Sequence, residues 1–341
     1  MHHILILGAG RIGILIAHLL QENGNYTAYL GDIKARKGVI ALDVTNPLAI
    51  SDYLKNNTAI GTIISCLPYY HNPLVAELAR THCLNYFDLT EDIEVTRYVK
   101  ELAENADQAF VPQCGLAPGI VNIIAAHLIQ SDPQTKTAKL RVGALPITAN
   151  NALHYALTWS TEGLINQYGN PCLAIRNSEL AVLQPLEDLE VLEIDGAVYE
   201  AFNTSGGLGS MTGGYVGKID ELDYKTLRYP GHCEKMRFLM QDLKLNTDRK
   251  VLKHILERVL PKTIEDFIVI SVSTDTKQYV KKFNYLSPWS AIQMTTATGL
   301  CTVLDLVLSQ PGQYKGFVNQ YDFNWVDIVE NCFGKYFAEI A

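Results

Sequence analysis

The stretch Ile4-Leu5-Ile6-Leu7-Gly8-Ala9-Gly10-Arg11-Ile12-Gly13 decides the fold. Its apolar run predicts a buried strand, and the glycines that follow have the G-x-G-x-x-G spacing of a turn that opens a helix. Gly8 permits a tight turn, Gly10 lets the backbone approach a pyrophosphate, and Gly13 lets helix and strand pack closely. The free N–H groups at the helix start, near Arg11 and Ile12, bind the anion. The alternative is a glycine-rich turn without a ligand.

An acidic residue follows at the distance that a dinucleotide site requires. Asp32 lies nineteen residues beyond Gly13, at the end of the second predicted strand, and the ribose-binding carboxylate of such sites comes ~20 residues on. A carboxylate there accepts both ribose hydroxyls and repels a 2′-phosphate, which favours NAD. Lys34, Arg36 and Lys37 follow at once and could neutralise that phosphate, so NADP stays the second choice. The alternative is that Asp32 is a strand-end turn residue.

Further cofactor contacts are expected where later strands end, because open α/β sheets bind ligands outside the carboxyl ends of their strands. The third predicted strand ends at Asp43-Val44, and the fourth runs into Cys66-Leu67-Pro68, with Asn72 opening the next helix. We expect Cys66 to form a wall rather than a nucleophile, because no nearby group would lower its pKa. After the fifth strand come Asp88 and Glu91-Asp92. One of them could face the cleft, and a solvated turn or helix cap is the competing interpretation.

Strands and helices alternate up to Pro118, which predicts an α/β fold with a Rossmann-type doubly wound parallel sheet covered on both faces. Beyond Pro118, strand-like segments dominate, among them Leu153–Trp159, Leu189–Ile194 and Phe267–Ser273. They predict a second α+β domain with a mixed or antiparallel sheet. The stretch Ser290–Leu308 is apolar and helical. A length of 341 residues is likewise typical of about two domains.

Composition excludes several functional classes. The net charge is −8 and there is no basic block, so phosphate-backbone binding and a nucleic-acid partner are not expected. No apolar run approaches the ~18 residues of a membrane span, and no signal peptide is visible, which predicts a cytoplasmic protein. Seven cysteines without a C-x-x-C pair predict reduced thiols, and the nine histidines show no metal-ligand spacing. We therefore expect no bound metal.

Several segments around and beyond the boundary hold the side chains that chemistry needs. Gly115–Gly119 opens a helix at the boundary, which suits a hinge or a nicotinamide contact. Trp159–Gly163, Glu200–Gly207 and Thr226–His232 together hold carboxylates, an arginine, a histidine and several hydroxyls. Taken alone, each segment could be a structural turn.

On the segments Gly8–Gly13, Asp88–Asp92, Cys114–Gly119, Glu200–Asn203 and Thr226–His232, the sequence resembles the saccharopine dehydrogenase-like family, most closely its L-lysine 6-dehydrogenase branch. The resemblance covers nearly the whole chain. It implies an NAD(P)-dependent oxidoreductase of amino-acid C–N bonds in lysine metabolism. It also implies a dinucleotide-binding domain of residues 1–118 with 290–341, which takes back the C-terminal helices. Residues 119–289 would form the substrate domain and, as a homodimer, the dimer sheet.

Two departures from the family pattern bear on the substrate. Ala117 stands where glutamate-forming saccharopine enzymes tend to have aspartate in Gly-Leu-Asp-Pro-Gly, and Glu162 replaces the arginine of their Trp-Ser-Ser-Arg-Gly segment. A saccharopine pocket must neutralise three carboxylates, so an arginine replaced by a carboxylate argues against that substrate. The glutamate would instead suit a substrate end that carries an amine, such as lysine or a polyamine-like compound. The glycine-rich segment 203–217 is looser than expected for the lysine 6-dehydrogenase branch, which leaves the exact substrate open.

The predicted reaction moves a hydride between the nicotinamide and a carbon that bears nitrogen. Because an ammonium has no lone pair, the amine must first lose a proton. The candidates are Glu162 to hold or deprotonate the amine, Arg228 for a bidentate contact to the α-carboxylate and His232 as a proton relay. Alternatively, Glu162 and Arg228 pair with each other or with structural partners, and His232 is a packed helix-start residue.

Two other functions remain open at this stage. One is a reductive condensation that joins an aldehyde to an amine, of the saccharopine or carboxynorspermidine type. The other, from a different class, is a dinucleotide-binding sensor that kept the fold without turnover, because fold alone does not establish catalysis.

Overall fold

The computed structural model describes residues 1–338, so the last three residues of the predicted first domain, 339–341, lie outside the described part. The chain forms two compact units, one of Met1–Ile120 with Thr295–Ala341 and the other of Val121–Met294. The predicted boundaries after residues 118 and 289 compare with 120 and 294 in the structure. Each unit has its own sheet.

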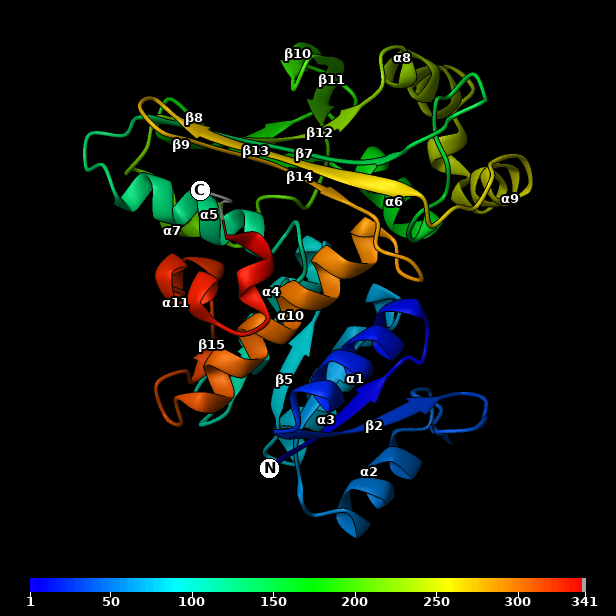
Figure 1. The fold of residues 1–341 in the computed structure, drawn as a ribbon, viewed down its shortest axis with the longest axis vertical. Helices are drawn as coiled ribbons and strands as arrows, with labels where there is room; N and C mark the ends of the chain where they lie inside the picture. Colours follow the sequence, from blue (N-terminus) through cyan, green and yellow to red (C-terminus); the bar gives the residue numbers. More distant parts are fainter. Residues whose placement is uncertain (339–341) are drawn as a thin grey trace. The chain divides into compact units, whose positions relative to one another are not determined.

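The first unit contains a seven-stranded sheet in the order β15-β6-β5-β4-β1-β2-β3. Figure 1 labels β15, β5 and β2 of this sheet. Every neighbouring pair runs parallel, which confirms the predicted Rossmann-type sheet. Its strands are β1 (His2–Leu7), β2 (Tyr26–Asp32), β3 (Val39–Ala41), β4 (Ile60–Ser65), β5 (Asn85–Asp88), β6 (Ala109–Val111) and β15 (Gly316–Phe317). Its helices are α1 (Arg11–Asn23), α2 (Pro47–Asn56), α3 (Asn72–Thr81), α4 (Ile93–Leu102), α10 (Ala291–Ser309), which begins in the other unit, and α11 (Trp325–Glu330).

Local signals explain where the helices of this unit begin and end. The Asn46 side chain accepts from Ala49 N at 3.3 Å and starts α2, as its N-cap position predicts. The side chain of Asp92 accepts from Val95 N at 2.9 Å and starts α4. Parallel strands need crossover connections between them.

The short apolar strands β1 and β4 are largely buried and lie in the centre of the sheet.

The second unit contains an eight-stranded mixed sheet, in the order β10-β11-β12-β7-β13-β14 with β8 and β9 to one side. Within it β12 pairs with β7 in parallel, whereas the other pairs are antiparallel. The strands are β7 (Thr137–Pro146), β8 (Cys172–Arg176), β9 (Glu179–Leu183), β10 (Glu190–Ile194), β11 (Ala197–Asn203), β12 (Glu221–Arg228), β13 (Asp266–Thr274) and β14 (Gln278–Asn284). The helices are α5 (Ile120–Gln130, from the boundary), α6 (Thr161–Gly169), α7 (Met211–Tyr215), α8 (His232–Arg237) and α9 (Arg249–Val259).

The prediction of a strand over Leu153–Trp159 is wrong. Within this stretch the chain makes a single isolated bridge, from Leu157 to Lys262. Tyr155 and Leu157 instead pack in a hydrophobic core with residues of α6, α8 and α9. The apolar spacing of the segment therefore reports burial among helices rather than membership of the sheet.

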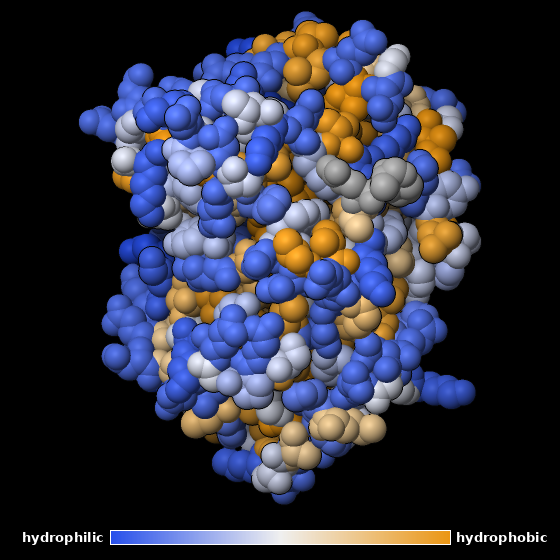
Figure 2. All heavy atoms as spheres, turned by 60° about the vertical axis from the view of Figure 1, so that its left-hand side comes forward, coloured by the Kyte–Doolittle hydropathy of each residue, from blue (hydrophilic) through white to orange (hydrophobic). Residues whose placement is uncertain are grey.

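One described helix, α10, is long and apolar enough to cross a membrane by length and composition. The absence of an uninterrupted apolar run had hidden this feature, because threonines and a glutamine interrupt the helix. However, 78% of the stretch is buried inside the protein. The face of the molecule in Figure 2 is mostly hydrophilic, with small groups of apolar side chains between the polar ones.

Candidate functional site

The glycine turn between β1 and α1 leaves room for a ligand. Gly8 has φ +101°, and a Cβ there would come within 2.7 Å of the Cys66 carbonyl oxygen; a Cβ on Gly13 would come within 2.0 Å of Gly8 O. In contrast, a Cβ on Gly10 would meet nothing within 4 Å. The start of α1 has no side-chain cap and no acidic residue in its first turn. Its N–H groups and open backbone therefore fit a pyrophosphate.

Two side chains of opposite charge flank this turn. Asp32 Oδ2 accepts from Ala9 N at 2.8 Å, so the carboxylate that the spacing predicts does lie at the glycine turn. The Arg36 guanidinium donates to the carbonyl oxygen of the same residue, Ala9. Asp32 suits the ribose hydroxyls of NAD, and Arg36 suits the 2′-phosphate of NADP. The turn therefore fits either dinucleotide. When bound, the dinucleotide would supply a hydride acceptor or donor.

The other residues predicted at the cofactor lie in different surroundings. Burial raises the pKa of the Cys66 thiol to about 12, which supports a wall rather than a nucleophile. Leu67 packs partly against the core of the unit, and Pro68 is exposed. Val44 is 7% exposed and belongs to that same core, so its side chain supports the sheet. Asp43 accepts from Thr45 N and Oγ1, at 2.9 and 2.7 Å, in a local turn.

The prediction that Asn72 contacts the cofactor is corrected, because its amide is hydrogen-bonded to other side chains of the first unit. It is 2% exposed. Its Oδ1 accepts from Ser65 Oγ at 2.7 Å, and its Nδ2 donates to Asp88 Oδ2 at 3.1 Å. The other oxygen of Asp88 accepts from Thr90 N at 2.9 Å and from Gln113 N at 3.0 Å. This network ties together the segments that leave β4, β5 and β6. Asn72 therefore holds the site's frame rather than presenting its amide to a ligand.

In the second unit, Arg228 at the end of β12 lies in an aromatic surrounding. Its Nε donates to Tyr168 Oη at 2.9 Å and its Nη1 to Leu227 O at 2.8 Å. The guanidinium carbon lies 5.1 Å from the ring centre of Tyr155 and 5.9 Å from that of Tyr168. Arg228 is 3% exposed, yet it forms no ion pair with any carboxylate among residues 1–338. Its charge is thus buried without a counter-ion.

His232 fixes the phenol that holds this arginine. Its Nδ1 lies 2.7 Å from the carbonyl oxygen of Leu153, which can accept only, so Nδ1 carries the proton. Nε2 is then an acceptor and takes the Tyr168 hydroxyl hydrogen, at 3.1 Å. Complete burial lowers the pKa of His232 to about 3, so the ring stays neutral. The predicted proton relay through His232 is corrected by this geometry, because both nitrogens hold structural partners.

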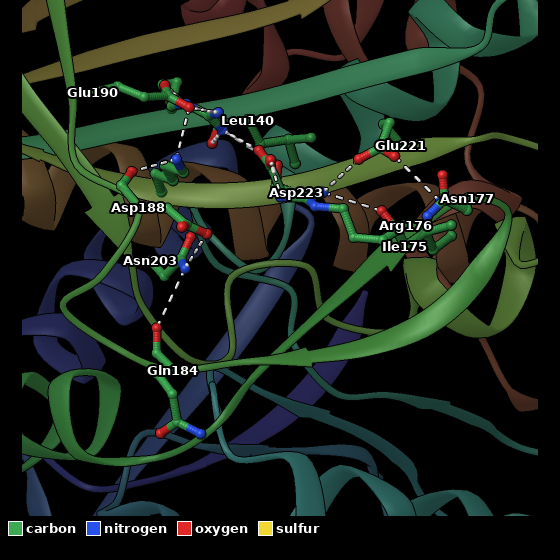
Figure 3. A network of polar contacts seen from close by, with 12 residues as sticks. Leu140, Ile175, Arg176, Asn177, Gln184, Asp188, Glu190, Asn203, Glu221 and Asp223 are labelled. Atoms are coloured by element: carbon green, nitrogen blue, oxygen red, sulfur yellow. Dashed lines mark hydrogen bonds and ion pairs between the residues drawn. The ribbon is translucent and has the colours of Figure 1, made fainter.

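A second arginine in the same sheet shows what a structural role looks like. Arg141 is also 3% exposed, but it pairs with Glu190 at 2.9 Å and with Asp223 at 2.5 Å. Lys225 pairs with Glu190 at 2.7 Å in the same network, part of which Figure 3 shows. Side chains alternate along a strand, so on β12 Asp223 and Lys225 point to one face and Arg228 to the other. The two buried arginines therefore differ in face and in charge compensation.

Glu162 lies in the first turn of α6 and is already paired. Its Oε1 lies 2.7 Å from Lys253 Nζ, and both side chains are 37% exposed. This matches the alternative of a structural partner. A carboxylate that holds a lysine ammonium is not free to take a proton from a substrate, so we correct the prediction of Glu162 as the base.

One feature of this region could not be predicted from the sequence. Tyr168 lies 60 residues before the arginine it holds, in a helix that the sequence does not predict. Nothing marks it as different from the other tyrosines of the chain. Among residues 1–338, no cluster of three or more histidine, cysteine or acidic side chains could hold a metal ion.

Comparisons with known proteins bear on both units. The family model for the saccharopine dehydrogenase NADP binding domain matches residues 4–112, and the model for the saccharopine dehydrogenase C-terminal domain matches residues 115–333. An α-aminoadipic semialdehyde synthase of Arabidopsis thaliana is 25% identical over 182 residues, which span 50% of this chain and 16% of that protein's length.

Solved structures show the same fold over almost the whole chain. The structure of apo saccharopine dehydrogenase (L-Glu forming) from Saccharomyces cerevisiae matches with a TM-score of 0.75 at 16% identity, covering 94% of each chain. The C. glutamicum DAP dehydrogenase in complex with DAP matches with a TM-score of 0.50 at 12% identity, covering 96% of this chain and 98% of that one. The two family models cover both units in the predicted order, and the predicted family is confirmed: the chain belongs to the saccharopine dehydrogenase family, with an NAD(P)-binding first unit.

Proposed function

We propose that the protein is an NAD(P)-dependent dehydrogenase that oxidises the C–N bond of an amino acid with a side-chain amine, such as lysine. The lysine 6-dehydrogenase branch is part of this proposal. The observation that carries it is the buried guanidinium of Arg228, which has no carboxylate partner among the described residues. In the other unit, the open glycine turn supports the cofactor side of the reaction.

An amino-acid carboxylate is the ligand that this guanidinium suits best. Burying a charged side chain without a counter-ion costs roughly several kcal/mol, and a bound anion offsets that cost. Tyr168 and Leu227 accept from Nε and Nη1, and the Tyr155 hydroxyl is a further hydrogen-bond partner of the guanidinium. A guanidinium has five N–H donors, so donors remain for a ligand. A planar fork of this kind matches a carboxylate.

The chain's residues then divide the work. Arg228 fixes the α-carboxylate, and Tyr168 with His232 holds the arginine in its orientation. The glycine turn and Asp32 would hold the cofactor, and Arg36 donates to the backbone of the same turn.

Reductive condensation remains the second candidate, because both family models carry the saccharopine dehydrogenase name. Its reaction would join an aldehyde to an amine with NAD(P)H. Arg228 suits this reaction equally well, because both kinds of substrate carry an α-carboxylate. The choice of lysine over saccharopine rests on Glu162 and Ala117, where the family's arginine and aspartate are missing.

A cofactor-reduction screen tests the proposal. Lysine, ornithine, linear diamines and saccharopine are each incubated with NAD⁺ and with NADP⁺, and reduced nicotinamide is followed by absorbance. We expect turnover with lysine or ornithine and none with diamines, which have no carboxylate for Arg228. Turnover only with NAD(P)H plus an aldehyde and an amine would establish the condensation. Cofactor binding without any turnover would establish the sensor and refute the proposal.

A further inference from the structure

The loop after β5 carries an acidic side chain that the described structure leaves unused. Its neighbours all have structural tasks: Asp88 accepts from Thr90 N and Gln113 N, and Thr90 Oγ1 accepts from Asp92 N at 3.1 Å. Asp92 caps α4. Glu91, between them, has no hydrogen bond or ion pair from its carboxylate within residues 1–338, apart from its own backbone N–H. The residues around Glu91 are therefore hydrogen-bonded to one another, whereas its own carboxylate has no partner from another residue in this part of the chain.

This loop leaves the sheet at the carboxyl ends of the strands, where the cofactor turn also lies. Asp88 at the end of β5 is paired with Ser65 at the end of β4, and Ser65 with Leu7 at the end of β1. The segments that follow these strands contain Glu91, Cys66 and the glycine turn. They therefore start side by side at the carboxyl ends of the strands. Open α/β sheets bind their ligands outside these ends.

A second unpaired acceptor lies on the neighbouring loop. Gln113 follows β6 and is 1% exposed, and its side-chain Oε1 has no hydrogen-bond partner. One oxygen of Asp88 ties the backbone of Gln113 to that of Thr90, next to Glu91. A buried acceptor without a donor is costly. Two acceptors on loops tied together point to a ligand that supplies N–H donors, as an amine does.

The ionisation of Glu91 suits a group that exchanges protons at neutral pH. Burial raises its pKa to about 7, and the charges of Asp92 and Asp88 act in the same direction. Burial likewise raises the pKa of Asp88, which is fully buried. A carboxyl group whose pKa lies near the working pH is the most efficient general base.

We propose that Glu91 is a catalytic residue that takes the proton from the side-chain ammonium of the substrate, while Gln113 Oε1 accepts a second N–H bond from the same nitrogen. This inference rests on the proposed amine oxidation. The ammonium R–CH₂–NH₃⁺ gives one proton to the Glu91 carboxylate and becomes R–CH₂–NH₂. The nitrogen lone pair forms the C=N bond as hydride leaves the carbon for the nicotinamide of NAD(P)⁺. Water then converts R–CH=NH₂⁺ to an aldehyde and ammonium, and Glu91 returns its proton to solvent.

The pH dependence of Glu91→Gln tests the proton transfer. We expect kcat/KM at pH 7 to fall roughly 100-fold, as for other general bases. The deficit should shrink as the pH approaches the ~10.4 of a free lysine amine, because solution then supplies the neutral amine. Glu94→Gln is the matched control, since that side chain is exposed on α4 and paired with Arg97. Activity of Glu91→Gln within threefold of the wild type at pH 7, or a deficit equal at every pH, would overturn the assignment.

A binding experiment separates this inference from the proposed reaction. Calorimetry on the protein loaded with NADH compares lysine with norleucine, which has the same backbone but no side-chain amine. Glu91→Gln should weaken the binding of lysine about tenfold, as loss of a charge-assisted hydrogen bond does. The affinities for norleucine and NADH and the Tm should stay unchanged. If the wild type oxidises no amine and this selective loss still occurs, the reaction is refuted and the amine contact stands. If lysine and norleucine lose affinity equally, or neither does, Glu91 does not contact the amine.

Discussion

Replacing Arg228 by lysine tests the carboxylate site most directly. Arg228→Lys keeps the charge but loses the planar fork, the Nε bond to Tyr168 at 2.9 Å and the stacking over Tyr155. A hydrogen bond to a charged group contributes about 1.5–3 kcal/mol, and 1.36 kcal/mol corresponds to a factor of ten. One lost bond to the substrate carboxylate should therefore raise KM roughly 10- to 150-fold. Because that contact is equal in the ground and transition states, kcat should change much less.

Arg141→Lys is the control for this experiment, since Arg141 is equally buried but is held by Glu190 and Asp223. It should lower the Tm and leave KM within about threefold, because its effect is on folding. The assay is steady-state kinetics on folded protein, with the amino acid varied at saturating cofactor. An unchanged KM in Arg228→Lys, or an equal rise in both variants, would refute the reasoning.

Four further predictions follow from the geometry. Gly10→Val should weaken NAD(P) binding more than tenfold without lowering the Tm, because its side chain enters open space where the pyrophosphate would lie; unchanged affinity in a fluorescence titration would contradict the site. Asp32→Ala should weaken NAD by about 1.5–3 kcal/mol and Arg36→Ala should weaken NADP selectively, as the ratio of the two Kd values will show. Tyr168→Phe should raise KM several-fold with little change in kcat, since it frees Arg228; a fall in kcat alone would argue against a positioning role. Burial raises the pKa of Asp266 to about 6, so the folded protein binds the carboxyl proton more tightly than the unfolded chain does. The stability that this protonated carboxyl contributes is therefore lost as the pH rises from about 4 to 7. Asp266→Asn should flatten that part of a curve of Tm against pH.

The sequence predicts the first unit well because each local signal there agrees with the final structure. The glycine spacing, the acidic residue Asp32 and the strand–helix alternation all refer to short-range geometry. The link between β2 and β3 is short, holds an isolated Arg36–Val39 bridge and has no helix. Such features need no knowledge of distant partners.

The second unit is harder to predict, because its buried polar residues depend on distant partners. Strand β12 carries Asp223, Lys225 and Arg228, a pattern typical of a surface, yet all three are less than 10% exposed. Arg141 and Glu190, which compensate two of them, come from β7 and β10. Hydropathy along the chain cannot show such pairing.

The candidate site follows the same division. Arg228 is singled out by its motif, whereas Tyr168, 64 residues before His232, joins the site through tertiary contact alone. For Glu91 the sequence offers an acidic loop of three carboxylates, and only the hydrogen bonds show which of them is free.

Because the two faces of β12 have different roles, substitutions on this one strand should affect either the amount of folded protein or its activity. The side chains of Asp223 and Lys225 neutralise buried charges on one face, so inherited or engineered changes there would deplete the folded protein in a cell. At Arg228, on the other face, a change could leave the protein present in normal amounts but inactive. A survey of variants along this strand would then separate loss of folded protein at Asp223 and Lys225 from loss of turnover at Arg228. Expression level alone would therefore be a misleading guide to which β12 variants are harmful.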